Sequence, residues 1–284
     1  LMIGLFASDL DGTLLGATHR VGRQVLSAAK AACDSDRHFA VATGRTLRST
    51  DDLGFSKLPI EAICANGAIV LGRDSEIMYH VPLDADFVGE LLESFPQVSF
   101  ECISLDHTYL RISKEQWEEG WRRRMGLLAR VAMRGMRMRE GECVFDQTDA
   151  RILSHEIVKV NCRVSDDPAL TQGVLDFVAA HADRAINAPF SVRLFEITDP
   201  RATKGDAVAW LARQLGLSEG EVAVYGDGGN DLTMLSRFEH SYAPSGAIAD
   251  AKRAAAKVIG SNLLYAVPRH IRSTVRRERR ASRA

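Results

Sequence analysis

Two groups of carboxylates stand directly after apolar runs of the sequence, one near the start of the chain and one near residue 230. The first group holds Asp9 and Asp11, and the second holds Asp227 and Asp231. Carboxylate oxygens at this density suit a hard cation such as Mg²⁺, which reaches its substrate through phosphate oxygens. Glycine-rich turns beside both groups offer backbone amides that suit a phosphoryl group. These residue types therefore indicate phosphoryl chemistry assisted by a divalent cation.

Two further signals occupy similar places in the sequence. Thr43-Gly44-Arg45 ends a short apolar run, and Lys204 opens a predicted helix just before the second acidic group. Taken singly, each of these signals is weak, because an Asp-Gly pair after a strand is usually only a turn. Taken together and in this order, the carboxylates, the hydroxyl and the ammonium indicate a site for phosphoryl chemistry.

The elements that must position these residues alternate between strand and helix. Nearly continuous apolar runs predict strands that are buried on both faces, as in a parallel sheet. In chain order the pattern predicts a strand at Met2–Leu10, a helix at Val21–Ala32, a strand at His38–Thr43, a helix at Arg45–Leu53, a strand at Ala62–Ala65, a helix at Lys204–Leu215 and a strand at Glu221–Tyr225. Such an order is typical of a doubly wound α/β sheet, whose ligands sit beyond the carboxyl ends of the strands.

Between residues 83 and 190 the pattern changes. Val98–Ile103 and His107–Ile112 read as a hairpin, and a charged helix is expected over Lys114–Met133. We therefore predict an α+β unit at 83–190, inserted into a core formed by residues 1–82 and 191–284.

At these positions the sequence resembles the haloacid-dehalogenase-like (HAD) phosphatases. Asp9-Leu10-Asp11-Gly12-Thr13-Leu14 is similar to their first motif, Thr43-Gly44-Arg45 to the second, Lys204-Gly205 to the third, and Gly226 to Asp231 to the fourth. The insertion resembles, by position and strand pattern, the cap of the Cof-type, class IIB branch. The resemblance implies a Rossmann-like doubly wound core with an inserted α+β cap that chooses the substrate.

The resemblance also implies catalytic roles for the first two aspartates. Asp9 would attack phosphorus and form an aspartyl phosphate. Asp11 would protonate the leaving alkoxide and then activate water as a base. A dehalogenase needs no such acid, so the presence of Asp11 favours hydrolysis of phosphate esters.

Ligand contacts follow from the same resemblance. Mg²⁺ would be held by the Asp9 carboxylate, the backbone carbonyl of Asp11 and the Asp227 carboxylate, with Asp231 in support. Phosphate oxygens would be bound by the following groups: the amides of Leu10 and Gly44, the hydroxyl of Thr43, the ammonium of Lys204 and the amide of Asn230.

The function expected from the sequence is a Mg²⁺-dependent phosphatase for small phosphomonoesters, sugar phosphates above all. Two alternatives stay open: a phosphosugar mutase or glycosyl-phosphate phosphatase of the same branch, and a non-catalytic module that binds a phosphorylated metabolite. Binding alone needs no acid at Asp11, which favours an enzyme.

Composition sets the broad class of protein. The chain has 284 residues, 46% hydrophobic and 26% charged, with a formal net charge of -1. These values exclude a disordered chain and a fibre, and no overall field points to nucleic acid or membrane. Five cysteines without a C-x-x-C pair suggest a reducing compartment. We therefore expect a cytoplasmic protein whose partner is a small phosphorylated metabolite.

The end of the chain, from Arg269 to Arg283, carries many arginines and one glutamate, Glu278. Such a segment could touch nucleic acid or membrane. The sequence favours the plainer interpretation of a frayed helix or a solubilising tail.

Overall fold

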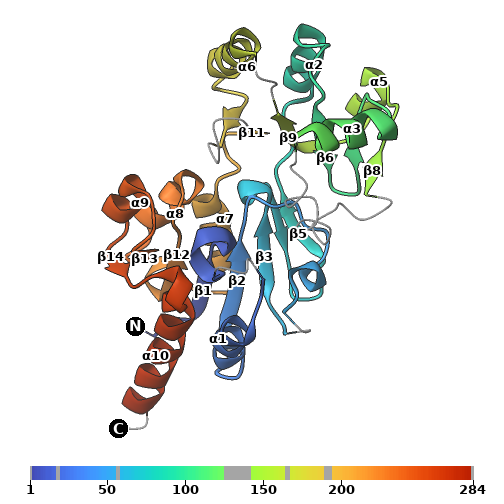
Figure 1. The fold of residues 1–284 in the computed structure, drawn as a ribbon. Coiled ribbons are helices and arrows are strands. Elements are labelled where there is room, and N and C mark those ends of the chain that lie inside the picture. The colour runs from blue at the N-terminus through green and yellow to red at the C-terminus, as the bar shows by residue number, and fades with distance from the viewer. Residues whose placement is uncertain are drawn as a thin grey trace. The chain divides into compact units, whose positions relative to one another are not determined.

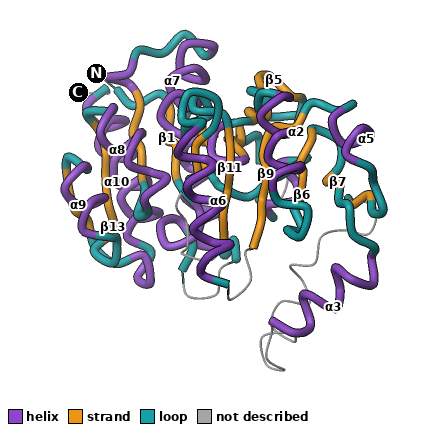
Figure 2. The backbone as a smooth tube through the Cα atoms, turned by 90° about the horizontal axis from the view of Figure 1, so that it is seen from above, coloured by secondary structure: helices purple, strands orange, loops and turns teal. Residues whose placement is uncertain are grey.

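The computed structural model describes residues 2–16, 20–55, 58–124, 142–163, 167–188 and 194–282. The chain divides into two compact units, residues 1–81 with 201–284 and residues 82–200. Figure 2 shows that helices and strands are mixed in both units. The second unit extends to Pro200 rather than to residue 190, because the strand Leu194–Thr198 pairs with another strand of that unit.

The first unit, which we call the core unit, is built on one eight-stranded sheet (Figure 1). Its strands lie in the order β14-β13-β12-β1-β2-β3-β4-β5. The pairs from β14 to β3 are parallel, and β4 and β5 are added antiparallel at one edge. The strand bounds are β1 (Leu5–Ser8), β2 (His38–Ala42), β3 (Glu61–Cys64), β4 (Ile69–Leu71), β5 (Ile77–His80), β12 (Val222–Tyr225), β13 (His240–Pro244) and β14 (Lys257–Ile259).

Helices cover this sheet, and their bounds are α1 (Arg23–Cys33), α7 (Lys204–Gln214), α8 (Leu232–Arg237), α9 (Ala249–Ala254) and α10 (Ala266–Ala281). Leu5 and Ala7 of β1 belong to a buried cluster with residues of α7, α8 and α9. Phe6, which alternates with them along the strand, is also fully buried. Burial on both faces explains the continuous apolar runs, so the predicted doubly wound α/β class is confirmed.

The order of the strands fixes where a ligand site can form. From β1 the sheet continues through β2 and β3 on one side and through β12, β13 and β14 on the other. The carboxyl ends of β1 and β12 therefore flank the point at which the winding direction changes. Crevices at such points are where open α/β sheets bind ligands.

The prediction of a helix after β2 is wrong. Residues Arg45–Leu53 do not form a continuous helix, and only the short turn η2 (Thr50–Leu53) is helical. The carbonyl of Arg45 accepts a hydrogen bond from the amide of Ala65, 3.0 Å away, and not from an amide one helical turn further along its own segment. Ser49 caps η2 through its side chain. The segment after β2 is thus a loop tied to the end of β3.

The second unit, which we call the cap unit, has a six-stranded sheet in the order β10-β11-β9-β6-β7-β8. Its pairs are antiparallel except β7 with β8. Strands β6 and β7 pair antiparallel, which confirms the expected hairpin. Helix α3 is the described part of the helix expected at Lys114–Met133. The rest of that expected helix falls within residues 125–141, which lie outside the described residues. The bounds are α2 (Ala85–Ser94), β6 (Glu101–Ser104), β7 (Thr108–Tyr109), α3 (Lys114–Arg124), β8 (Cys143–Val144), α5 (Asp149–Leu153), β9 (Ile157–Arg163), α6 (Pro168–Ala180), β10 (Ile186–Asn187) and β11 (Leu194–Thr198).

Helix α10 is a docked element of the core unit over residues 266–281, not a frayed tail. It packs against α1, and its Glu278 forms an ion pair of 2.5 Å with the buried Arg37. Among the described residues, no helix is both long and apolar enough to cross a membrane.

His270 anchors the first half of α10 to the sheet. Its Nδ1 lies 3.0 Å from the hydroxyl of Tyr225, the last residue of β12, and its ring centroid lies 4.2 Å from that of Tyr242. Burial, together with the charges of Arg277 and Lys257, lowers the pKa of His270 to about 4. The ring is therefore neutral in the folded protein at neutral pH.

This anchor predicts a pH dependence of stability. In the unfolded chain His270 has a pKa near 6.5, so its ring gains a proton as the pH falls through 6.5. In the folded protein the ring stays neutral until the pH approaches its lowered pKa of about 4. Stability is thus fully present above pH 6.5 and is lost as pH falls toward 4. With a discount for partial solvent access, the loss is about 2 kcal/mol. Denaturant unfolding of wild type and His270→Gln from pH 7 to 4 checks this, and parallel curves would contradict it.

Candidate active site

The carboxyl ends of β1 and β12 bring two aspartates together that are more than 200 residues apart in sequence. The amide of Asp9 donates to the carbonyl of Tyr225 over 2.9 Å, which aligns the two strand ends. Carboxylate oxygens of Asp9, Asp227 and Asp231 all lie within 4.8 Å of one another. Three of the four predicted carboxylates therefore lie together at the switch point of the sheet.

A sharp turn after β1 shapes this cluster. The helical turn η1 (Leu10–Leu14) contains Gly12 at φ +85°, a conformation that favours glycine, and a Cβ there would clash with the carboxylate of Asp227. The turn brings the hydroxyl of Thr13 to Asp227, to which it donates a hydrogen bond. Thr13 is thus a site residue that the sequence analysis did not single out.

Lys204 is buried completely at the start of α7. Its Nζ lies 2.6 Å from Oδ1 of Asp9 and 2.7 Å from Oδ1 of Asp231. The helix can approach this closely because a Cβ at Gly205 would clash with the backbone of Thr233 on α8. Burial alone would lower the pKa of Lys204, but the two carboxylates raise it above its ordinary value. Lys204 is therefore a fixed cation at the centre of the site.

Both carboxylate oxygens of Asp231 accept hydrogen bonds from the protein. Oδ1 accepts one from Nζ of Lys204, and Oδ2 accepts two, from the amides of Asp227 at 2.8 Å and Gly228 at 2.9 Å. Asp9 differs, since no donor among the described residues contacts its Oδ2. Asp231 thus acts as a scaffold, and Asp9 keeps an oxygen available for chemistry.

The charges around Asp9 test whether a cation fits here. Burial raises the pKa of Asp9 well above its ordinary value; Lys204 opposes this, and Asp231 adds to it. Burial also raises the pKa of Asp227, which the Thr13 hydrogen bond offsets in part. One ammonium does not balance three clustered carboxylates, and hard oxygen donors are the ligands that Mg²⁺ prefers. The donor set therefore fits a divalent cation.

The remaining predicted residues line the same strand ends. Thr43 follows β2 and is almost fully buried, and its Oγ1 accepts a hydrogen bond of 3.1 Å from the amide of Arg45. Asn230 donates over 3.0 Å to the side chain of Asn66, which sits in the left-handed region at φ +59°. Leu10, whose amide was predicted to bind phosphate, is buried in η1, and Gly44 directly follows Thr43.

The predicted acid, Asp11, has a partner that the sequence did not reveal. Arg45 forms a two-pronged ion pair with it, with Nε 2.9 Å from Oδ2 and Nη2 2.6 Å from Oδ1. The Arg45 backbone is itself fixed by Thr43 and Ala65. Arg45 therefore holds the Asp11 carboxyl group in one orientation.

This pairing predicts a selective kinetic defect in Arg45→Gln. Losing the guanidinium should lower kcat about 10- to 100-fold on alkyl phosphates, which need a well-placed acid, and much less on p-nitrophenyl phosphate. Arg48→Gln, three residues along the same loop, is the matched control. Steady-state kinetics on both substrates gives the answer. A rise in KM that is equal for both would mean instead that Arg45 binds the phosphate.

Comparisons with known proteins identify the family and the fold of the chain. A family model described as haloacid dehalogenase-like hydrolase matches residues 6–270. A protein of Enterobacter sp. (strain 638) named HMP-PP phosphatase is 29% identical over 236 residues, which is 82% of this chain and 81% of that protein. A haloacid dehalogenase-like hydrolase from B. subtilis has the same fold, with a TM-score of 0.79 at 21% identity, over 95% of this chain and 99% of that one. A HAD subclass IIB sugar phosphatase gives a TM-score of 0.73 at 19% identity, over 95% and 98%.

Proposed function

Because the chain belongs to the haloacid dehalogenase-like hydrolase family and is a phosphoric monoester hydrolase, we propose that it hydrolyses small phosphomonoesters, sugar phosphates among them, through an aspartyl phosphate on Asp9. The observation that carries this proposal is the geometry around Asp9. It is a buried carboxylate with one oxygen fixed by Lys204 and the other without a described partner, two residues before a second carboxylate.

The acidic cluster is proposed to hold Mg²⁺ through the carboxylates of Asp9 and Asp227 and the carbonyl of Asp11, with Asp231 fixing the loop. When bound, the cation supplies positive charge that reduces the repulsion between a carboxylate and a phosphate dianion. Lys204 adds a second positive charge from the protein itself.

In the proposed first step, Oδ2 of Asp9 forms a bond to phosphorus while the bond from phosphorus to the leaving oxygen breaks. The leaving alkoxide takes a proton from Asp11, which lies on the same strand end. Thr43, Asn230 and the amides of Leu10 and Gly44 are proposed to hold the phosphoryl oxygens in line.

In the second step Asp11 acts in reverse. It takes a proton from a water molecule, whose oxygen bonds to phosphorus while the bond from phosphorus to Asp9 breaks. Inorganic phosphate leaves, and Asp9 is restored as a carboxylate. The ion pair with Arg45 orients the Asp11 carboxylate for this second transfer. The cap unit is proposed to select the leaving group.

The test is phosphate release from a panel of aryl, sugar and nucleotide monophosphates, together with HMP-PP, the compound named in the Enterobacter relative. Each is assayed with Mg²⁺ and again with EDTA. We expect release that requires the metal and is fastest on one class of small ester. Release that persists in EDTA would contradict the metal assignment. Silence across the panel from a folded protein would favour a mutase or a binding module.

A further inference from the structure

Helix α10 carries a concentration of positive charge that the proposed phosphatase reaction does not use. It holds six arginines and one glutamate, in a chain whose net charge is -1. The single carboxylate, Glu278, is occupied by the buried Arg37. No carboxylate of the described residues lies within ion-pair distance of the arginines of α10.

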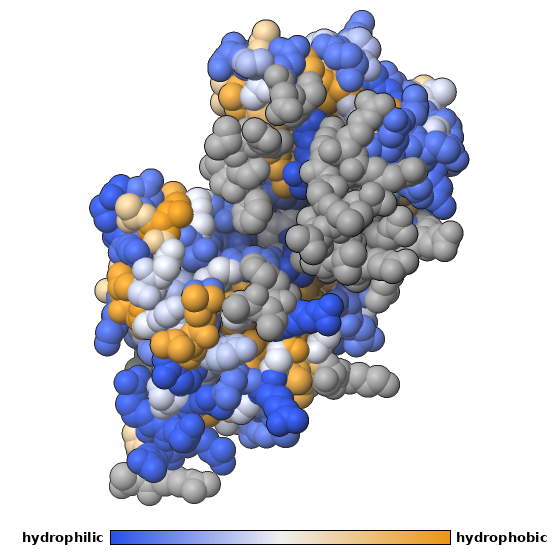
Figure 3. Space-filling model, in the orientation of Figure 1, coloured by the Kyte–Doolittle hydropathy of each residue, from blue (hydrophilic) through white to orange (hydrophobic). Residues whose placement is uncertain are grey.

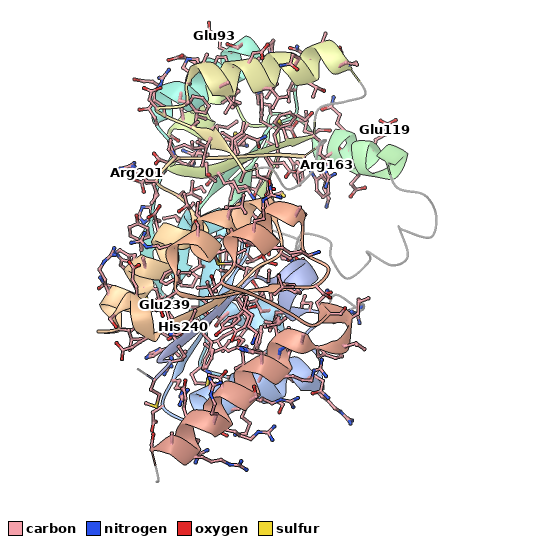
Figure 4. All side chains as sticks on the ribbon, turned by 90° about the vertical axis from the view of Figure 1, so that its left-hand side faces the viewer. Glu93, Glu119, Arg163, Arg201, Glu239 and His240 are labelled. Carbon is pink, nitrogen blue, oxygen red and sulfur yellow. The ribbon has the colours of Figure 1, made fainter. Side chains whose placement is uncertain are left out.

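These arginines share one side of the helix. At 100° per residue, the six lie within an arc of about 160°, while the opposite side is buried in the core unit. Figure 4 shows the nitrogen-tipped side chains of α10 projecting away from the sheet. We call this exposed side the arginine arc; it consists of Arg269, Arg272, Arg276, Arg277, Arg279 and Arg280.

The helix dipole does not explain the arc. Cations are favoured in the last turn of a helix, which accounts for Arg279 and Arg280. Arg272 donates a hydrogen bond of 3.2 Å to the hydroxyl of Ser27 on α1, which accounts for its placement. Arg269 lies in the first turn of α10, where the dipole disfavours a cation, so its placement needs another reason.

Apolar residues stand at the start of the arc. Leu263 and Leu264, in the turn η7 (Asn262–Leu264) that leads into α10, are 59% and 68% exposed. Nη2 of Arg269 lies beside Gly260, which precedes that turn. Figure 3 shows an orange area directly above the blue surface of α10 in this view. Exposed leucines beside arginines that have no carboxylate partner among the described residues therefore form one mixed surface.

We propose that the arginine arc, with Leu263 and Leu264, is a docking surface for an anionic lipid bilayer. Arginines pair with phosphate groups in a two-pronged manner, and the leucines enter the boundary between headgroups and acyl chains. The apolar side of α10 is occupied by the core unit, so the helix adsorbs by charge and only the leucines insert. The exposed leucines favour a lipid bilayer over nucleic acid as the ligand, because a phosphodiester backbone offers them no apolar environment.

The test is sedimentation of the full-length protein with vesicles of phosphatidylcholine and phosphatidylglycerol in equal parts, and with phosphatidylcholine alone. The arc variant is Arg269→Gln/Arg276→Gln/Arg280→Gln. Its matched control, Arg23→Gln/Arg213→Gln/Arg253→Gln, removes the same charge from exposed sites on α1, α7 and α9. We expect wild type and control to bind only the anionic vesicles, and the arc variant to bind them roughly a hundredfold more weakly.

A second pair of measurements separates lipid from nucleic acid. Leu263→Ser/Leu264→Ser should weaken vesicle binding about tenfold or more, and duplex DNA should bind wild type more weakly than the anionic vesicles do. Phosphatase activity, unchanged in all three variants, reports that each is folded. Equal weakening by the arc and control variants would overturn the proposal, as would tight DNA binding that ignores the leucines.

Discussion

Asp9→Asn is expected to lower phosphate release at least about a thousandfold while the protein stays folded. The amide keeps the size of the side chain but lacks the negative oxygen that attacks phosphorus in the proposed first step. Asp11 does not replace this nucleophile, because its carboxyl group is proposed to transfer protons only. The loss should therefore appear in kcat on every substrate, activated aryl phosphates included.

The same substitution should cost little or no stability. The pKa of Asp9 is raised in the folded protein by burial and by Asp231, so its ionised form is disfavoured there relative to the unfolded chain. A neutral side chain removes that penalty at neutral pH, although Lys204 loses one partner. The measurements are phosphate release and a thermal melt. Asp206→Asn, one exposed carboxylate on α7, is the control. A variant with a tenth of wild-type activity would refute the nucleophile assignment.

The sequence predicted the site best at the ends of the strands. Continuous apolar runs predicted which strands are buried on both faces, and parallel strands end at one edge of their sheet. From this alone Asp9, Asp227 and Lys204 were placed in one site, although they are distant in sequence. Their individual catalytic roles came from the family resemblance and remain proposals.

What the sequence missed depends on local backbone geometry. The contact of Thr13 with Asp227 requires the left-handed Gly12, which a pattern of residue types does not specify. Residues 45–53 were predicted to form a helix, yet the backbone of Arg45 is hydrogen-bonded to Thr43 and Ala65 instead. Tertiary hydrogen bonds overrode local propensity there.

The arginines of α10 illustrate a different limit. Their spacing at positions 269, 272, 276 and 280 follows the period of a helix, and this was visible in the sequence. The segment was nevertheless interpreted as a tail, because whether its apolar side is covered depends on a partner elsewhere in the chain. Packing against α1 and the Arg37 ion pair supply that partner.

Lys204→Met should have the largest effect on stability. Methionine fits the apolar stem of lysine but leaves Asp9 and Asp231 buried without the ammonium that lies 2.6 and 2.7 Å from them. Loss of the ammonium leaves both buried carboxylates uncompensated, whereas Asp9→Asn keeps the pair of Lys204 with Asp231; breaking a buried pair in this way costs about 3–5 kcal/mol. For a chain of this size that corresponds to a melting temperature lower by roughly 10 °C. Turnover should fall with it, because the nucleophile loses its fixed orientation.

Added Mg²⁺ distinguishes this cause from ordinary damage to packing. A divalent cation at the acidic cluster would replace part of the missing charge, so Mg²⁺ should raise the melting temperature of Lys204→Met more than that of wild type. Lys159→Met is the matched control, since Lys159 is equally buried and paired with Glu196, but lies in the cap unit. It should lose stability without gaining any response to Mg²⁺. Lys204→Met/Asp231→Asn should recover part of the loss, because it removes one of the two uncompensated carboxylates. An unchanged melting temperature in Lys204→Met would mean that the cluster is balanced without its lysine.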